Sequence, residues 1–237
     1  MGELGHVVIE GKNVQCYTVM PKNPNGAGIV LASAVWGINS DICALADGYA
    51  AIGYAVAIPN LFWRQEPDHR MEYDLSRMPF VTKLADSGSD AEGLSDLKAT
   101  KEQLAVRSGA KRFATLGWCY GGRIVGLAAA TDMFELCVAM YPTFFEKHVT
   151  VAPKVIRPLS LHLPEVERFG TVEDAVERIV HAFANHKLAE SFVYPNVNHG
   201  FDFAPPHPYS NHAAARLCDQ RVILALDRVV VRGEKFK

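Results

Sequence analysis

The stretch Gly117-Trp118-Cys119-Tyr120-Gly121-Gly122 decides how the middle of this chain folds, because it joins two apolar runs through glycines. Residues 112–116 are typical of a short strand, and residues 124–130 are apolar enough for a buried helix. A strand that turns sharply into a helix through Gly-x-Cys-x-Gly is a nucleophile elbow, since the glycines leave room in a strained turn. Cys119 then lies at a helix N-terminus, where the dipole favours a thiolate. The alternative is a buried free cysteine before a glycine-rich turn.

On both sides of this motif, short strand-like runs alternate with longer helical runs from about residue 28 onward. This alternation is typical of a mostly parallel sheet covered by helices. We therefore predict an α/β-hydrolase fold, with a twisted, mostly parallel central sheet and helices on both faces in three layers. The expected strands are 7–9, 16–20, 28–33, 54–58, 113–117, 136–140, 159–163 and 191–194, the first two forming a hairpin; the expected helices are 40–52, 94–108, 121–130, 172–186 and 211–230.

The sequence shows no linker, internal repeat or low-complexity tract, so we expect residues 1–237 to form a single domain. The one long connection is the polar, proline-containing segment 60–93. We expect it to be a loop or a partly helical flap above the sheet edge, because long loops in compact domains usually serve function.

Composition excludes several classes of protein. A net charge of −2 with no dense basic run argues against nucleic acid as a partner. No apolar run is long enough to span a bilayer, and no secretory signal is visible at the N-terminus. The 5 scattered cysteines and 9 histidines show no metal-ligand spacing. We therefore expect a cytoplasmic protein that uses no metal or cofactor and is a monomer or small homo-oligomer.

A thiol nucleophile needs a base, and the base needs an acid that orients it. His199 is the candidate base, because it follows the last expected strand at the sheet edge where the elbow also emerges. The chain order nucleophile, acid, histidine places the acid after the strand 159–163. Glu167 and Glu165 compete for this role, and Glu167 is preferred on position. A surface turn is the alternative for all three residues.

Two backbone N–H groups are needed to stabilise an oxyanion. One should come from Tyr120, directly after the nucleophile. The other should come from the loop after the strand 28–33, where Val35 is the candidate. Trp36 follows it and would give the site a flat wall, or else pack in the core.

These motifs resemble the dienelactone hydrolase family, cysteine-using α/β-hydrolases that open cyclic enol esters or cleave related esters. The resemblance covers nearly the whole chain and is carried by the Gly-x-Cys-x-Gly-Gly elbow, by His-Gly-Phe at 199–201 and by Trp-Gly-Ile-Asn at 36–39. It implies Cys119 as nucleophile and His199 as base, with Glu167 at the position of the family's aspartate.

Two departures from the family pattern concern the substrate and the thiol. Ala34 stands where members of this family carry a glutamate that helps to generate the thiolate, so activation would rest on His199 and the helix dipole. Phe203 stands where they carry an arginine for a substrate carboxylate. Another cation could serve instead, or the pocket could prefer an apolar or aromatic acyl group. The candidates are Arg77, Arg70 or Arg64 for the cation, and Phe201, Phe203, Trp36, Trp63 and Tyr141 for apolar walls.

The sequence thus predicts a hydrolase that cleaves a small-molecule ester, lactone or thioester through a Cys-His-acid triad and an acyl-thioester. Ala34 and Phe203 keep a second hypothesis open, a degenerate hydrolase fold that binds a small molecule or a partner without turnover. A third hypothesis is a redox-active thiol at Cys119, since an exposed thiol of low pKa is readily oxidised.

Overall fold

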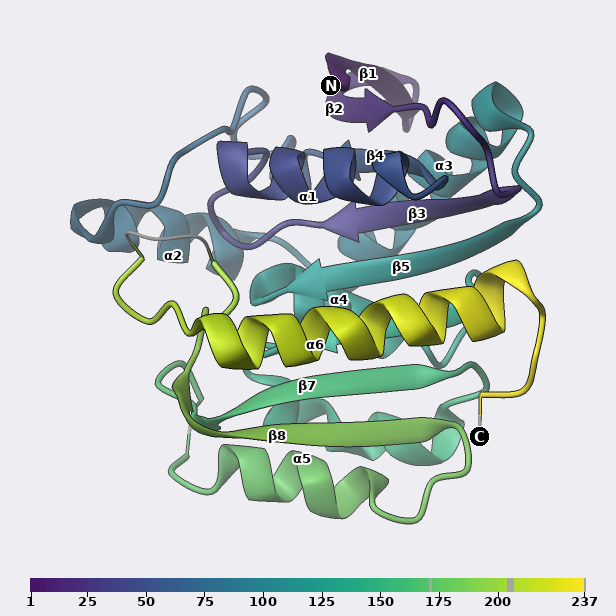
Figure 1. Ribbon diagram of the computed structural model, residues 1–237. Helices are drawn as coiled ribbons and strands as arrows, with labels where there is room; N and C mark the ends of the chain where they lie inside the picture. The colour runs from purple at the N-terminus through teal and green to yellow at the C-terminus, as the bar shows by residue number, and fades with distance from the viewer. Residues whose placement is uncertain (171, 204–206, 237) are drawn as a thin grey trace.

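The computed structural model describes residues 1–170, 172–203 and 207–236. Its centre is an 8-stranded sheet in the order β1-β2-β4-β3-β5-β6-β7-β8 (Figure 1). β1 and β2 form an antiparallel hairpin, β2 is antiparallel to β4, and every other pair is parallel. The strands are β1 Glu3–Ile9, β2 Lys12–Val19, β3 Ala27–Ala32, β4 Ala55–Pro59, β5 Arg112–Trp118, β6 Leu136–Met140, β7 Leu159–Val166 and β8 Ala189–Asn198.

Helices cover both faces of this sheet, so the predicted three-layer α/β-hydrolase fold is confirmed (Figure 1). One face packs against α1 Ser40–Ala51 and α6 His212–Ala225, which continues as the π-helical segment η3 Leu226–Val231. The other face packs against α3 Asp90–Ser108, α4 Tyr120–Ala128 and α5 Ala175–Phe183. Shorter elements are η1 Leu75–Arg77, α2 Met78–Ser87 and η2 Phe145–Lys154.

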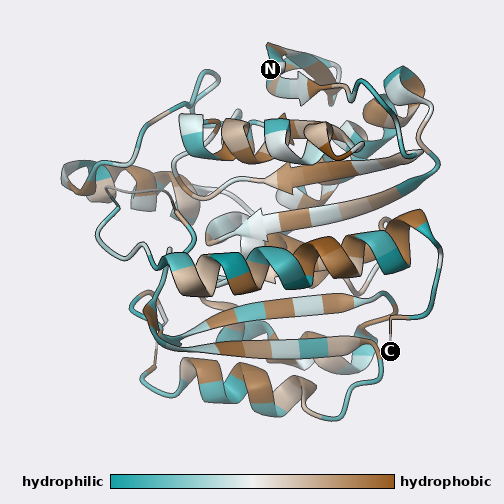
Figure 2. Cartoon of the chain, viewed as in Figure 1, coloured by the Kyte–Doolittle hydropathy of each residue, from teal (hydrophilic) through white to brown (hydrophobic). Residues whose placement is uncertain are grey.

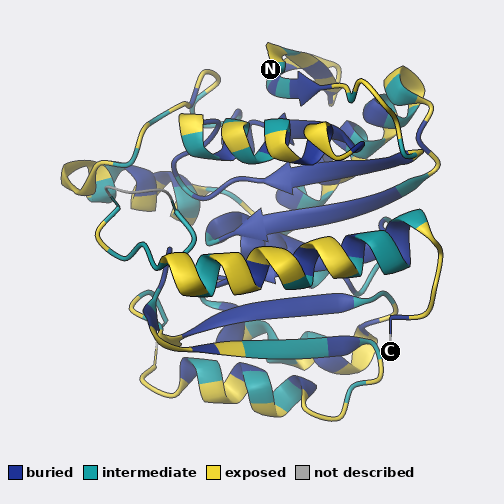
Figure 3. Ribbon diagram, viewed as in Figure 1, coloured by how far each residue is buried: buried dark blue, intermediate teal, exposed yellow. Residues whose placement is uncertain are grey.

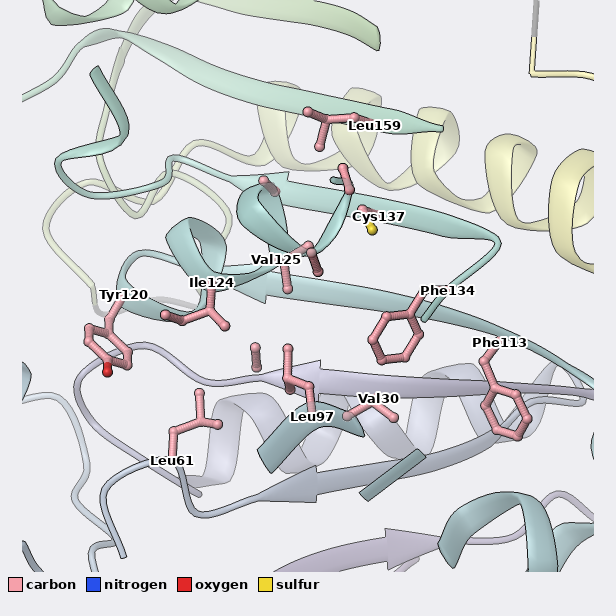
Figure 4. Close-up of a cluster of buried hydrophobic side chains, with 14 of the residues drawn as sticks. Val30, Leu61, Leu97, Phe113, Tyr120, Ile124, Val125, Phe134, Cys137 and Leu159 are labelled. Carbon is pink, nitrogen blue, oxygen red and sulfur yellow. The ribbon is translucent and has the colours of Figure 1, made fainter. Parts of the chain in front are cut away.

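Two apolar clusters, one on each face of the sheet, follow from the two-residue period of the strands. In β3, Ile29 and Leu31 pack with α1 and α6, whereas Val30 and Ala32 pack with α3 and α4. The central strands are apolar along their length and buried (Figures 2 and 3), as is typical of parallel strands covered twice. Figure 4 shows the α3–α4 cluster around Val125 of α4.

The segment 60–93 is more regular than a loop. It contains η1 and α2, and α3 already begins at Asp90 instead of 94. A capping box explains the early start: the Ser89 side chain accepts from the Glu92 N–H, and the Glu92 carboxylate accepts from the Ser89 N–H. α2 lies beyond the carboxyl ends of β3 and β5, at the left of Figure 1.

β8 runs to Asn198, beyond its expected end at 194, and therefore delivers the next residue, His199, directly to the carboxyl edge of the sheet. Within the described ranges, no helix has both the length and the apolar character needed to cross a bilayer.

Candidate active site

Cys119 occupies a strained turn between β5 and α4, with φ 56° and ψ −115°. The flanking glycines are required by close backbone contacts. A Cβ at Gly117 would overlap the backbone of Gly121, and a Cβ at Gly121 would overlap the carbonyl of Ala32. A Cβ at Gly122 would lie 2.7 Å from a backbone oxygen of β6. The sequence of the elbow is therefore dictated by the approach of α4 to three strands.

His199 and Glu167 form a buried pair at the same edge. Nδ1–H of His199 donates to both carboxylate oxygens of Glu167, at 2.9 and 3.0 Å. The Phe169 N–H also donates to Glu167, at 2.7 Å, which fixes the carboxylate. Glu165 instead accepts from the backbone N–H of Asn196 at 2.7 Å. Of the two competing glutamates, Glu167 is the one that contacts the imidazole.

The sulfur of Cys119 lies 3.0 Å from Oγ1 of Thr143, whose backbone N–H donates to the Cys119 carbonyl at 3.1 Å. Nε2 of His199 is buried and has no hydrogen-bond partner among the residues that the structure describes. Burial raises the pKa of the Cys119 thiol, but the His199 charge and the Thr143 hydroxyl outweigh it, and the net shift is downward. Burial lowers the pKa of His199, but Glu167 and Cys119 raise it overall. Both shifts favour a thiolate beside an imidazolium.

The His199 ring is held between two aromatic side chains. Its centroid lies 4.5 Å from that of Tyr141 and 4.8 Å from that of Phe169. Asp202 accepts hydrogen bonds from the Tyr141 hydroxyl at 2.6 Å and from Nε1 of Trp118 at 2.8 Å. Because Trp118 immediately precedes the nucleophile, this one carboxylate ties the histidine loop to the elbow.

The two expected oxyanion-binding residues, Val35 and Tyr120, line the same cavity as Cys119. Tyr120 is the first residue of α4, so its N–H has no acceptor within the helix. Val35 lies in the loop after β3, and its carbonyl accepts from Nε2–H of His69 at 2.7 Å. The next carbonyl, that of Trp36, accepts from the Met71 N–H at 3.0 Å. The segment before α2 therefore fixes the two peptides that follow Val35. The peptide that carries the Val35 N–H is held by its own carbonyl, that of Ala34, which accepts from the Gly37 N–H at 3.0 Å.

These groups open into a cavity of about 650 Å³. Cys119, Tyr120, Val35, Thr143 and His199 form its floor. Its other lining residues include aromatic and charged side chains; the aromatic members are Trp36, Tyr73, Phe169, Phe203, His207 and Tyr209, and the charged or titratable ones are Asp86, Asp90, Arg123, Lys147 and His148. Its size and mixed walls fit a small molecule with an apolar part.

Two expected substrate residues do not line this cavity. The Arg77 guanidinium lies over the ring of Phe80, 5.3 Å from its centroid, so the arginine is used on the outside of α2. Phe201 is fully buried and packs on Tyr194, with centroids 4.8 Å apart. Phe201 belongs to the apolar cluster on the α1–α6 face of the sheet, so its side chain lies in the core. Arg64 is also engaged, in an ion pair with Asp96 at 2.9 Å. Trp36 and Phe203 do line the cavity.

Thr143 and Arg123 were not anticipated from the sequence. Thr143 follows β6 at the carboxyl edge of the sheet, which was the available signal. Arg123 lies one helical turn after Cys119, and its Nε donates to Asp90 at 2.9 Å. The described part of the chain holds no cluster of three or more histidines, cysteines and carboxylates that could bind a metal ion.

Comparison with known proteins agrees with this architecture. Residues 14–229 match the Dienelactone hydrolase family. Carboxymethylenebutenolidase 1 of Cupriavidus pinatubonensis is 24% identical over 216 residues, covering 90% of this chain and 91% of the relative. A carboxymethylenebutenolidase of Pseudomonas putida is 24% identical over 196 residues, covering 82% and 83%.

Solved structures show the same fold. A Klebsiella pneumoniae protein provisionally named a dienelactone hydrolase superposes with a TM-score of 0.82 at 25% identity, covering 94% of this chain and 97% of the other. The dienelactone hydrolase of Anabaena variabilis superposes with a TM-score of 0.67 at 13% identity, covering 94% and 97%. Because the family matches this chain over most of its 237 residues, the chain belongs to the dienelactone hydrolase family.

Proposed function

We propose that the protein hydrolyses a small ester, lactone or thioester, with Cys119 as nucleophile, His199 as proton carrier and Glu167 as the acid that orients it. The observation that carries the proposal is the paired arrangement of His199. Its Nδ1–H is held by Glu167, while the buried Nε2 has no hydrogen-bond partner among the described residues, and the ring interacts electrostatically with Cys119, which lines the same cavity. This is the division of roles that a nucleophile–base–acid triad requires.

In the acylation step, the Cys119 thiolate attacks the carbonyl carbon and a C–S bond forms. The carbonyl π electrons move to oxygen, which accepts hydrogen bonds from the Val35 and Tyr120 amides. When this intermediate collapses, the bond to the leaving oxygen or sulfur breaks. The leaving group takes the proton from Nε2–H of His199, and an acyl-thioester remains.

In the deacylation step, Nε2 of His199 takes a proton from water as the water oxygen attacks the thioester carbonyl. The same two amides stabilise the second oxyanion. Its collapse breaks the C–S bond, and the acid product leaves. The thiolate returns to its position beside the re-protonated imidazolium, so no external reactant besides water is consumed.

Ala34 offers no carboxylate to generate the thiolate, so in this proposal His199 takes that part. The pKa of Cys119 is lowered and that of His199 is raised before any substrate binds. The curated relatives are named carboxymethylenebutenolidases, which supports an unsaturated lactone as a substrate class.

The proposal is tested with a panel of p-nitrophenyl acetate, a thioester and an enol-lactone, assayed on wild type and Cys119→Ala. Loss of all turnover in the variant is expected. The matched control is Cys43→Ala, which removes another partly exposed free thiol outside the cavity and should retain activity. Equal rates for wild type and Cys119→Ala would refute the proposed nucleophile.

A further inference from the structure

A second hollow of about 390 Å³ lies between α1 and α6, the two helices on the front face in Figure 1. Leu45 and Tyr49 of α1, Ile52 directly after this helix and Ile223 of α6 give it apolar walls. We call this hollow the α1–α6 groove. The reaction described above makes no use of it.

Phe203 is the wall shared by the catalytic cavity and the α1–α6 groove, since its side chain lines both. A small void of about 10 Å³ lies between them and is also bordered by Phe203. Trp36 borders the void and the catalytic cavity, whereas Leu45 borders the void and the groove. The three spaces therefore lie in a row that the Phe203 side chain interrupts.

Among the described residues, the ring of Phe203 contacts two other rings. Its centroid lies 6.2 Å from that of Tyr141 and 4.9 Å from that of His207. Its backbone is fixed independently, because its carbonyl accepts from the Ser210 hydroxyl at 2.6 Å and its N–H donates to the Gly200 carbonyl at 3.3 Å. Truncating the side chain should therefore open the wall without releasing the loop.

The chemistry of the α1–α6 groove limits what can enter it. Among the described side chains that line it, the charged ones are Asp41, Asp202 and Asp219, and none is basic. Asp202 is already bonded to Trp118 and Tyr141. An uncharged hydrocarbon chain gains from burial against the apolar walls, whereas a chain that ends in a carboxylate is repelled.

We propose that Phe203 sets the acyl-chain length of the substrate, and that the α1–α6 groove receives the distal part of a long uncharged acyl chain when the ring is displaced. This inference rests on the proposed ester hydrolysis. With the ring in place, the protein selects short acyl groups. Once the ring no longer blocks the groove, each methylene that enters it should raise kcat/KM by about fourfold, the value expected for burial of one CH₂ group.

The test compares kcat/KM for p-nitrophenyl acetate and p-nitrophenyl decanoate. Phe203→Ala should raise the decanoate-to-acetate ratio at least tenfold over wild type. Phe192→Ala, which removes a partly buried ring outside both spaces, should leave the ratio unchanged. In Phe203→Ala, an ester of decanedioic acid with one free carboxylate should be a poorer substrate than the decanoate by at least fivefold.

A second substitution refills the groove. A Cβ added at Gly48 of α1 meets no atom within 4 Å, so the backbone accepts a side chain there, at a position that lines the groove. Phe203→Ala/Gly48→Phe should return the ratio toward wild type. If acetate is hydrolysed normally but Phe203→Ala leaves the ratio unchanged, the chain-length inference is wrong and the proposed hydrolysis stands. If wild type hydrolyses neither ester, both are refuted. A gain that survives Gly48→Phe would place the long chain elsewhere.

Discussion

Replacing Thr143 by valine should raise the pKa of the Cys119 thiol, because it removes the hydroxyl that lies 3.0 Å from the sulfur while keeping the shape of the side chain. A hydrogen bond to a charged group contributes about 1.5–3 kcal/mol. One pKa unit corresponds to about 1.36 kcal/mol, so the loss predicts a rise of roughly 1–2 units. The direction follows from the hydroxyl's preference for the thiolate over the neutral thiol as its acceptor.

The assay is the pH dependence of Cys119 alkylation by iodoacetamide, followed by mass spectrometry. At a pH below both pKa values the thiolate fraction falls about 10- to 100-fold. A more basic thiolate is also more nucleophilic, which recovers about half of the logarithmic loss, so the rate should fall about three- to tenfold. Thr143→Ser should restore the wild-type profile.

Thr100→Val is the matched control, since it removes another buried threonine hydroxyl, one that donates to the Asp96 carbonyl far from the sulfur. Its alkylation profile should coincide with that of wild type. A Thr143→Val profile with an unchanged midpoint, in a protein that unfolds at the normal temperature, would refute a role for this hydroxyl in stabilising the thiolate. A midpoint that moves downward would mean that the hydroxyl instead accepts from the neutral thiol.

Three further predictions concern the acid, the resting ion pair and the elbow. Glu167→Gln should lower kcat for ester hydrolysis on the order of 10²–10⁴-fold, and Glu165→Gln should not; equal losses in steady-state assays would contradict the role given to Glu167. Alkylation of Cys119 in wild type should titrate with a midpoint below about 8.5, the pKa of a free thiol. The reason is that the pKa of Cys119 is lowered in the folded protein, so the thiolate persists until the pH falls below this lowered pKa. A midpoint at or above about 8.5 would exclude a resting thiolate. Gly121→Ala should destabilise the fold by about 1–3 kcal/mol in urea unfolding, since the added Cβ would overlap a backbone carbonyl. The control Gly48→Ala in α1 should stabilise the fold by about 0.5–1 kcal/mol. Similar unfolding midpoints for the two variants would mean that the elbow tolerates a side chain.

The sheet was readable from the sequence because its central strands are buried on both faces and appear as short apolar runs. β3, β6 and the elbow lie close to the expected ranges for this reason. The segment 60–93 was expected to be a loop or a partly helical flap, and it is partly helical. The bounds of its helix at 78–87 could not be placed, because apolar positions such as Val81 and Leu84 are embedded in a polar segment with prolines. Local sequence patterns predict those parts of the fold in which local preferences and tertiary packing agree.

The site was less readable, because it depends on contacts between loops that are distant in the chain. The side chains of His69 and Thr143 bond to residues 34 and 24 positions away, and Asp202 accepts from residues 61 and 84 positions away; no spacing rule encodes such pairs. Arg77 and Phe201 show the opposite failure. Phe201 lies two positions after His199, and Arg77 lies in the segment above the sheet edge, but neither side chain lines the cavity, because side-chain direction is set by tertiary packing.

Because Asp202 accepts two hydrogen bonds, the alignment of the catalytic groups and the shape of the cavity depend on different residues. Through Trp118 and Tyr141 they link the loop that carries the base to the turn that carries the nucleophile, and neither Trp118 nor Tyr141 lines the cavity. Substitutions in α2, whose residues line the cavity, can therefore change which substrates fit without altering the hydrogen bonds of Asp202. A design for new substrates would keep Asp202, Trp118 and Tyr141 unchanged and vary the cavity-lining residues of α2.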